Sequence, residues 1–374
     1  MKDIVIGGFV EGKLPYIGDQ ARTLEWLGEA HTWAQATLDN LSTEERRNLG
    51  RSMRRRVARF ACDPSRIARR GSVLPDFVRE RFDEMEIYDV SRRPDGAGSA
   101  ARNAVFARAV GEYFDSSYAK ESAPADDLVH VTCTGYVAPS AAMELVAKRG
   151  WGERTRVTHV YHMGCNASLS ALRIATGLAE PGRRVDVVHT ELCTLHLDPT
   201  DHSAEQLVVQ SLFADGLIRY HLTGGGSGLR VLALDEIIVP DSGDSMRWSV
   251  GDRGMHMTLA RDVPDRIAEG LRAFIERLTE RAGVASAPLD RAIFAVHPGG
   301  PRVIDQVAET LGLADGQVAA SRRILRDHGN MSSATLPHVW KLIAEDEAVA
   351  PGTLIVSLAF GPGLTVCGGV FRKE

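Results

Sequence analysis

The stretch Val160–Leu178, VYHMGCNASLSALRIATGL, places a cysteine where an expected strand gives way to an expected helix. Residues 157–161 are β-prone, and after Cys165 apolar residues recur at helical spacing. A cysteine at the start of a helix lies at the positive end of the helix dipole, which favours thiolate over thiol. We therefore regard Cys165 as a candidate nucleophile with a pKa below about 8.5, although a small buried hydrophobic residue would also fit this position.

The rest of the chain also alternates apolar strand-like runs with segments of helical period, which predicts an α/β fold of layered sheets and helices. Gly224–Gly226 lie between two β-like runs and mark the expected boundary between two halves, residues 1–225 and 226–374. A phosphate-binding loop is disfavoured there because no helix follows these glycines. Further strands are expected at 129–133, 185–192, 291–297 and 353–371, and helices at 42–63, 262–283, 301–312 and 333–345.

Composition restricts the class of protein. With 44 Lys and Arg against 49 Asp and Glu, the net charge of -5 gives no reason to expect a nucleic-acid partner. The five cysteines lie far apart, without the spacing of a metal site, so we expect free thiols and no bound metal. The sequence contains no apolar run of about 18 residues and begins without a signal-peptide pattern, so we expect a cytoplasmic protein that does not enter a membrane.

Three polar side chains stand where apolar runs end, namely Cys165, His297 and Asn330. A thiol can be acylated, an imidazole can take up the thiol proton, and an amide can donate a hydrogen bond to an oxyanion. Each residue alone also fits a structural role, as a core thiol, a hydrogen-bonded histidine or a helix N-cap. Together they indicate a catalytic arrangement.

The sequence around these three residues resembles the chalcone-synthase-like type III polyketide synthases. The motifs occur in the same order, and the similarity covers nearly the whole chain: GC at 164–165, TELCTLHLDPTD at 190–201, QSLFADG at 210–216, RDVPDRI at 261–267, HPGGPRVIDQV at 297–307, GNMSSAT at 329–335 and FGPGLTV at 360–366. The resemblance implies a thiolase fold, in which two similar halves pack as five αβαβα layers and usually form a homodimer. It also implies that Cys165, His297 and Asn330 are the catalytic triad.

The activity implied by this resemblance is that of a condensing acyltransferase. Cys165 holds an acyl group, a second activated thioester loses carbon dioxide, and His297 and Asn330 stabilise the resulting enolate, which attacks the acyl group in a Claisen condensation. Such an enzyme has no permanently bound cofactor, and its substrates are thioesters of coenzyme A or phosphopantetheine. In agreement, no G-x-G-x-x-G motif follows an expected strand.

The resemblance also identifies residues of the substrate pocket, and here the chain departs from its relatives. Phe213 matches the first of two bulky gatekeeper phenylalanines, whereas Met257 stands near the second. Ala138 aligns with the residue that reaches across the dimer and is smaller than usual. Ser332 and Gly363 belong to the matched motifs that border the pocket.

Three histidines lie near these motifs. His196 stands where the family adjusts the depth of its cavity, and His162 and His256 are close by in the sequence. We expect either hydrogen-bonded packing or a polar, proton-handling role toward an unusual second substrate.

The segment that follows Ser42 is expected to be an arginine-rich helix. Arg51, Arg55 and Arg59 share one helix face at i, i+4 spacing. Guanidinium groups bind phosphates, here those of coenzyme A or of a phosphopantetheine arm on an acidic acyl carrier protein, although a solvated charged surface is the alternative. Relatives that use coenzyme A tend to carry lysines in this segment, and Pro64 occupies one such position.

Two enzymatic functions therefore remain open. The first extends acyl thioesters into a β-keto chain that cyclises. The second joins two carrier-bound β-ketoacyl chains into an α-pyrone, as the stand-alone ketosynthases of myxobacterial α-pyrone antibiotics do; the departures at Met257, His196 and Ala138 keep this function open. A non-catalytic binding protein is disfavoured because the triad is intact.

Overall fold

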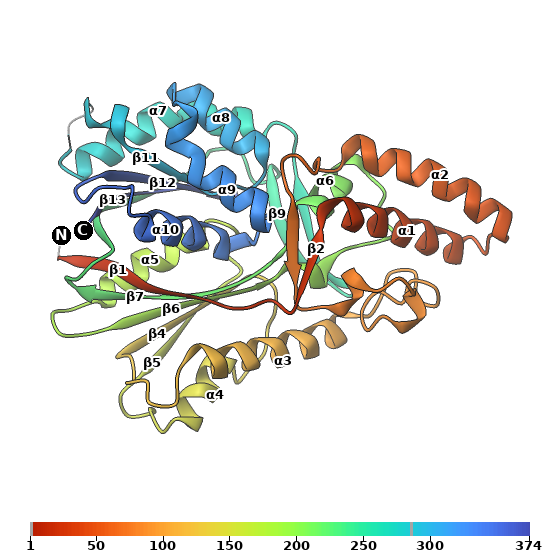
Figure 1. The fold of residues 1–374 in the computed structure, drawn as a ribbon, viewed down its shortest axis with the longest axis horizontal. Coiled ribbons are helices and arrows are strands. Elements are labelled where there is room, and N and C mark those ends of the chain that lie inside the picture. The colour runs from red at the N-terminus through yellow and green to blue at the C-terminus, as the bar shows by residue number, and fades with distance from the viewer. Residues whose placement is uncertain (1–2, 285–286) are drawn as a thin grey trace.

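The computed structural model describes residues 3–284 and 287–374 and is built around one continuous mixed sheet (Figure 1). The sheet bends between its two halves, where β1 and β8 pair through only two residue pairs, Val5 with Arg230 and Ile6 with Leu229. Its strands follow the order β11 (Ile293–Val296), β12 (Leu354–Gly361), β13 (Thr365–Lys373), β8 (Leu229–Ile238), β1 (Ile4–Glu11), β7 (Asp215–Gly224), β6 (Val185–Leu192), β4 (Asp127–Thr132) and β5 (Arg156–Tyr161).

Helices fill the space between the two halves of the sheet and cover both outer faces, which gives five layers (Figure 1). The central helices are α5 (Ala167–Leu178), which contacts β4 and β6 on one side and β12 and β13 on the other, and α10 (Thr335–Glu345). The predicted αβαβα architecture is therefore confirmed. The outer helices are α7 (Val263–Arg281), α8 (Pro301–Leu311) and α9 (Ala319–His328) over one half, and α3 (Ser99–Ser117) and α4 (Ala141–Lys148) over the other.

The remaining elements gather at one end of the layers. Two of them, α1 (Gln20–Leu38) and α2 (Thr43–Phe60), form a helical hairpin that projects from the body at the right of Figure 1. A capping box starts α2: the Ser42 hydroxyl accepts from the Glu45 N–H, and the Glu45 carboxylate accepts from the Ser42 N–H. The other elements are α6 (Ala204–Leu212) and the strand pairs β2 (Tyr16–Asp19) with β3 (Arg69–Ser72) and β9 (Met246–Gly251) with β10 (Gly254–Leu259).

Most predicted elements are found within a few residues of their expected bounds. The strand expected at 185–192 is β6, and a short 3-10 helix, Cys193–His196, follows it directly. The division between 1–225 and 226–374 falls in the turn between β7 and β8, and it stays a prediction. In the part of the chain that the structure describes, no helix is both long and apolar enough to cross a lipid bilayer.

The corner that carries Cys165 depends on a glycine. Between β5 and α5, Gly164 has a left-handed φ of 80°, and a Cβ added there would lie 2.2 Å from Cδ of Pro362 in the β12–β13 turn. Because Pro362 has no flexible side chain, the clash cannot be relieved by a rotamer change. The close approach of these two turns therefore fixes the position of the neighbouring Cys165.

We expect Gly164→Ala to lower the free energy of unfolding by about 3 kcal/mol or more, since left-handed strain and overpacking add. Gly150→Ala is the matched control, because Gly150 also has a positive φ of 66° but has open space around the added methyl group. It should lose only about 1 kcal/mol. Urea unfolding of both variants measures the difference, and equal losses would contradict the contact with Pro362.

Candidate active site

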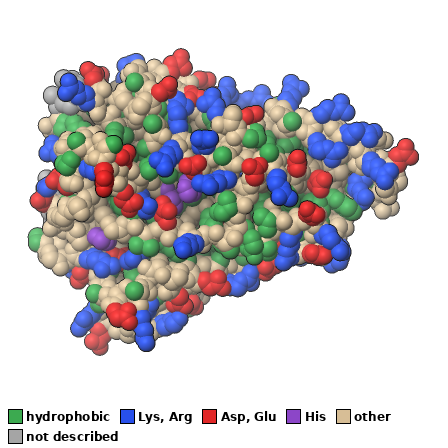
Figure 2. All heavy atoms as spheres, viewed as in Figure 1, with side chains coloured by type: hydrophobic (Ala, Val, Ile, Leu, Met, Phe, Trp, Pro, Cys, Tyr) green, Lys and Arg blue, Asp and Glu red, His purple; other side chains and the backbone are tan. Residues whose placement is uncertain are grey.

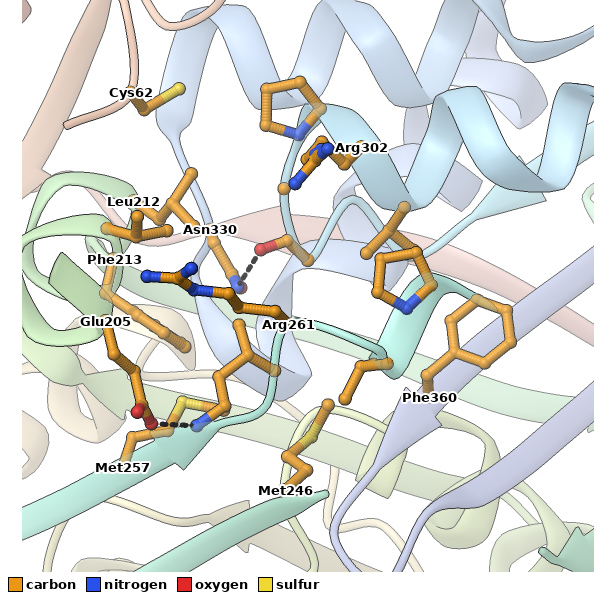
Figure 3. Close-up of a pocket in the computed structure, with 18 of the residues that line it drawn as sticks. Cys62, Glu205, Leu212, Phe213, Met246, Met257, Arg261, Arg302, Asn330 and Phe360 are labelled. Carbon is orange, nitrogen blue, oxygen red and sulfur yellow. Dashed lines mark hydrogen bonds between the residues drawn. The ribbon is translucent and has the colours of Figure 1, made fainter. Parts of the chain in front are cut away.

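The three predicted catalytic residues lie around one cavity of about 540 Å³, although they are far apart in the sequence. Cys165 precedes α5, His297 directly follows β11, and Asn330 lies between α9 and the 3-10 helix Ser332–Ala334. The cavity is lined mostly by apolar side chains, among which Phe213, Met246, Met257 and Phe360 are labelled in Figure 3. A cavity of this size and character suits a substrate with a long apolar part.

Cys165 is buried, and burial decides its acidity. Desolvation raises the pKa of its thiol to about 12, and the charge of the neighbouring Glu191 acts in the same direction. Hydrogen bonding with the Ser332 hydroxyl, 3.9 Å from the sulfur, and with the Asn330 side chain acts against this rise. The expectation of a pKa below about 8.5 was therefore wrong for the empty enzyme. The start of α5 lies two residues away, at Ala167, and its dipole does not offset the loss of water.

His297 is buried in the wall of the same cavity. Both of its ring nitrogens lack a hydrogen-bond partner among the residues that the structure describes. Its backbone N–H donates to the Leu358 carbonyl at 2.7 Å, which holds the residue beside β12. Burial lowers the pKa of the imidazole to about 3, so His297 is neutral and offers one N–H donor and one nitrogen acceptor to a molecule in the cavity.

Asn330 combines the two roles that its sequence position allowed. Its Oδ1 accepts from the Ser332 N–H at 2.9 Å, a capping contact at the start of the 3-10 helix, while Nδ2 donates to the Gly299 carbonyl at 3.1 Å (Figure 3). Backbone hydrogen bonds to Leu212 and from Ala214, at 2.9 and 2.8 Å, hold it beside Phe213. The second Nδ2 hydrogen remains to be donated to a substrate oxygen.

Only some of the predicted pocket residues line the cavities at Cys165. Phe213 and Met257 line the 540 Å³ cavity together with Cys165, and both also line a second, smaller cavity that includes Ser332. Gly363 lies in the β12–β13 turn, where its carbonyl accepts from the Ser242 hydroxyl at 2.8 Å. Ala138 is exposed on the surface. The roles of these residues toward a substrate stay predictions.

The three histidines near the motifs are all hydrogen-bonded. His196 Nε2 donates to the Thr134 carbonyl at 2.8 Å, and its Nδ1 accepts from the Met255 N–H at 3.2 Å. His162 Nε2 donates to the Trp248 carbonyl at 2.7 Å, and His256 lies 3.3 Å from the Gln206 amide. These contacts are those expected if the histidines have a packing role. They also place His196 and His162 next to Trp248, a residue that the sequence analysis did not identify.

The structure separates the predicted arginines from the cavity. Arg51, Arg55 and Arg59 lie on the exposed face of α2, and none of them lines the cavity. Figure 2 shows many basic side chains on the end of the molecule to which α2 belongs. The arginines that line the cavity are Arg66, Arg261 and Arg302, the last two labelled in Figure 3. Phe60, at the end of α2, also lines the cavity, so the basic helix ends at the cavity wall.

Glu191 is a site residue that the sequence analysis missed. It is fully buried near the end of β6, where it accepts hydrogen bonds from the Cys133 N–H at 2.9 Å, from the Thr134 hydroxyl at 3.2 Å and from the Ser333 hydroxyl. Burial raises the pKa of its carboxyl to about 7. A carboxylate at the end of a strand expected to be buried was the available signal. Among the described residues, no three His, Cys, Asp or Glu side chains are grouped so that they could hold a metal ion.

Comparison with known proteins identifies related sequences and folds. The family profiles "Chalcone and stilbene synthases, N-terminal domain" and "C-terminal domain" match residues 100–220 and 231–373. The chain is 31% identical over 259 residues to the 1,3,6,8-tetrahydroxynaphthalene synthase of Streptomyces griseus, covering 68% of this chain and 69% of that protein. It is also 31% identical over 258 residues to "Probable polyketide synthase 1" of Dictyostelium discoideum, of which it spans only 8%.

Solved structures show the same fold over the full length. The C-terminal type III polyketide synthase domain of Steely1 from Dictyostelium superimposes with a TM-score of 0.82 at 22% identity, covering 99% of both chains. The 1,3,6,8-tetrahydroxynaphthalene synthase of Streptomyces coelicolor A3(2) gives a TM-score of 0.80 at 22% identity, again over 99% of both chains. The predicted thiolase-type fold is thereby confirmed.

We expect iodoacetamide to alkylate Cys165 of the empty enzyme at about pH 7.5 at least about a hundredfold more slowly than free cysteine, because the raised pKa leaves little thiolate. The rate should rise about tenfold per pH unit through pH 9, since a thiol with a high pKa gains thiolate steadily as the pH rises. Mass mapping of modified peptides across this range measures it. A rate that levels off near neutral pH would show that Cys165 is already a thiolate, and would contradict the raised pKa of its thiol.

Proposed function

This chain belongs to the chalcone and stilbene synthase family of type III polyketide synthases, and we propose that it joins two acyl thioesters by Claisen condensation through an acyl–Cys165 intermediate. The observation that carries the proposal is the convergence of a buried thiol, an unpartnered neutral imidazole and an amide donor on one cavity. In this proposal residues 1–225 supply the nucleophile, and residues 226–374 supply His297 and Asn330.

In the loading step the substrate changes the protonation state of the site. A neutral thiol and a neutral imidazole face the empty cavity, so the Cys165 proton passes to His297 as sulfur attacks the thioester carbonyl. The carbon–sulfur bond to the carrier then breaks, and the departing thiolate takes the proton from His297. The products are acyl–Cys165 and a free carrier thiol.

In the condensation step His297 and Asn330 act as hydrogen-bond donors to the thioester oxygen of the second substrate. A carboxylated thioester loses carbon dioxide, and the electron pair of the broken bond becomes an enolate on the thioester oxygen. The N–H of His297 and the second Nδ2 hydrogen of Asn330 stabilise that charge. The enolate carbon attacks acyl–Cys165, the carbon–sulfur bond breaks, and the departing Cys165 thiolate takes a proton from water, which leaves hydroxide to the solvent.

The basic groups at the cavity suit a phosphate-bearing carrier. We assign the phosphate nearest the thioester to Arg66, Arg261 and Arg302, which line the cavity, in place of the α2 residues. Arg51, Arg55 and Arg59 project from α2 beyond the cavity wall. They would contact the remaining phosphates of coenzyme A or an acidic acyl carrier protein.

A second copy of the chain is the partner that we propose for the β5 edge of the sheet. β5 is the terminal strand, so one side of it has no neighbouring strand in the sheet. Exposed apolar side chains gather after β4, after β5 and on α4, where Tyr136 is 38%, Met163 39% and Met143 45% exposed. Ala138 lies in the same region, and a homodimer with isologous contacts would cover it.

The second candidate function is the joining of two carrier-bound β-ketoacyl chains into an α-pyrone, a step of antibiotic biosynthesis. Met257 in the cavity wall and the arginine-rich face of α2 favour it, because the first leaves a flexible wall and the second suits an acidic carrier protein. A joining enzyme should accept a β-ketoacyl thioester as the second substrate, whereas an extending enzyme requires malonyl thioester. Product masses from the two donors distinguish these functions.

We expect Asn330→Asp to be acylated at Cys165 but to condense about a hundredfold more slowly, because Asp keeps the oxygen that caps Ser332 and loses the Nδ2 donor. Asn330→Ala should lose the same activity and, in addition, about 1 kcal/mol of stability. Intact mass, product release and thermal midpoints on the same preparations measure these effects. A variant that condenses normally per folded molecule would remove Asn330 from the mechanism.

We expect a triple variant, Arg51→Glu, Arg55→Glu and Arg59→Glu, to raise KM for acyl thioesters of the natural carrier by about tenfold or more through lost charge attraction. Turnover of N-acetylcysteamine thioesters, which lack phosphates, should not change. Arg272→Glu, on the exposed side of α7, is the control for a charge reversal away from α2. Unchanged KM values for both coenzyme A and carrier-protein donors would show that α2 is only a solvated face.

A further inference from the structure

The space on the inner side of Cys165 is almost completely filled. A cavity of only about 20 Å³ lies there, bordered by Cys133 and Thr134 after β4, by Cys193 after β6 and by Trp248 on β9. This inner cavity has room for about one water molecule. By contrast, the outer cavity of about 540 Å³, which contains His297 and Asn330, lies on the other side of Phe213 and Met257.

Trp248 is the largest side chain that closes the inner space, and several contacts fix it. Its indole Nε1 donates to the Cys133 carbonyl at 2.7 Å, and its own carbonyl accepts from His162 Nε2 at 2.7 Å. The ring packs edge-on against His196, with centroids 5.9 Å apart. The β9–β10 hairpin pairs Trp248 directly with Met257, so the two side chains form one wall behind the thiol.

Besides the arginines assigned above to the carrier phosphate, the outer cavity also has apolar lining residues. Met246 and Phe360 lie opposite Leu212 and Glu205 in Figure 3. The apolar side chains of Leu259, Val263 and Ile267 also line the cavity, and the Leu259 N–H donates to the Glu205 carboxylate at 2.5 Å. These three side chains and those of Met246 and Phe360 offer no hydrogen-bond donor or acceptor. They would stabilise an aliphatic chain, whereas a chain of repeated ketone groups would lose its hydrogen bonds to water without replacement.

Building on the function proposed above, we infer that the acyl chain on Cys165 extends outward along this apolar lining, and that Trp248 prevents repeated extension into the protein behind the nucleophile. The substrate class is a preformed aliphatic acyl chain, which undergoes one condensation. This places the enzyme after reactions that build acyl thioesters. Trp248 is the residue that limits the number of condensations, and the apolar lining selects the length of the acyl group.

The test compares acyl groups and three variants of the full chain. Acetyl, hexanoyl and decanoyl thioesters of coenzyme A and of N-acetylcysteamine are supplied with malonyl-coenzyme A, and acyl-enzyme formation and product masses are recorded. We expect the wild-type protein to load decanoyl at least about tenfold faster than acetyl and to release singly extended products. Leu259→Trp, which narrows the cavity, should remove the preference for decanoyl over acetyl, measured as the ratio of the two loading rates.

Trp248→Ala should open the inner space and give products with additional two-carbon ketide units. Trp248→Phe separates volume from hydrogen bonding, since it lacks the Nε1 donor but keeps a large ring, and its products should match those of the wild type. Val250→Ala, at an exposed position of the same strand, is the control for disturbance of β9. Thermal midpoints identify any variant that is unfolded.

Two results would overturn the inference. One is a wild-type protein that adds several malonyl units to acetyl, and the other is a folded Trp248→Ala variant with wild-type products. The absence of an acyl adduct on Cys165 from every donor would instead overturn the proposed function itself, so the two failures are distinguishable.

Discussion

Burial of the Cys165 thiol is the constraint on which the rest of the site depends. The rise of its pKa from 9.0 to about 12 corresponds to about 4 kcal/mol, whereas a helix dipole contributes about 0.3–1 kcal/mol at its terminus. Burial therefore raises the pKa of the Cys165 thiol and lowers that of the His297 imidazole, which favours the neutral form of both groups around the cavity. In the proposed mechanism the neutral imidazole ring donates its N–H to the enolate.

The fold brings this about by placing two turns against each other. Gly164, before α5, lies against Pro362, between β12 and β13, so the strand-to-helix corner of the N-terminal half is packed onto the sheet of the C-terminal half. His297 and Asn330 come from that second half. The site forms only where the two halves meet, which explains why residues separated by more than a hundred positions surround one cavity.

The sequence allowed the strands, the helices and the three site residues to be predicted, because hydrophobic period and motif order are local properties of the chain. The five layers came from resemblance alone, since periodicity does not show which sheets face each other. The acidity of Cys165 was predicted wrongly because burial depends on residues from distant elements.

Trp248 and Glu191 were missed for a similar reason. Trp248 is placed by its cross-strand pairing with Met257, and Glu191 matters because it is buried and hydrogen-bonded at the end of β6. The face of α2 was predicted correctly as a helix surface, but only the structure shows that Arg261 and Arg302, and not Arg51, Arg55 or Arg59, line the cavity.

The central claim is that Cys165 carries the acyl group that the second thioester consumes. It is tested most directly by following the intact mass of the protein after addition of an acyl thioester and then of a second, activated thioester, with peptide mapping at each stage. The account predicts one acyl adduct, on the peptide that contains Cys165, which disappears as carbon dioxide and condensed product are released. An adduct on Cys62, Cys133, Cys193 or Cys367, or an adduct on Cys165 that persists while product forms, would contradict it.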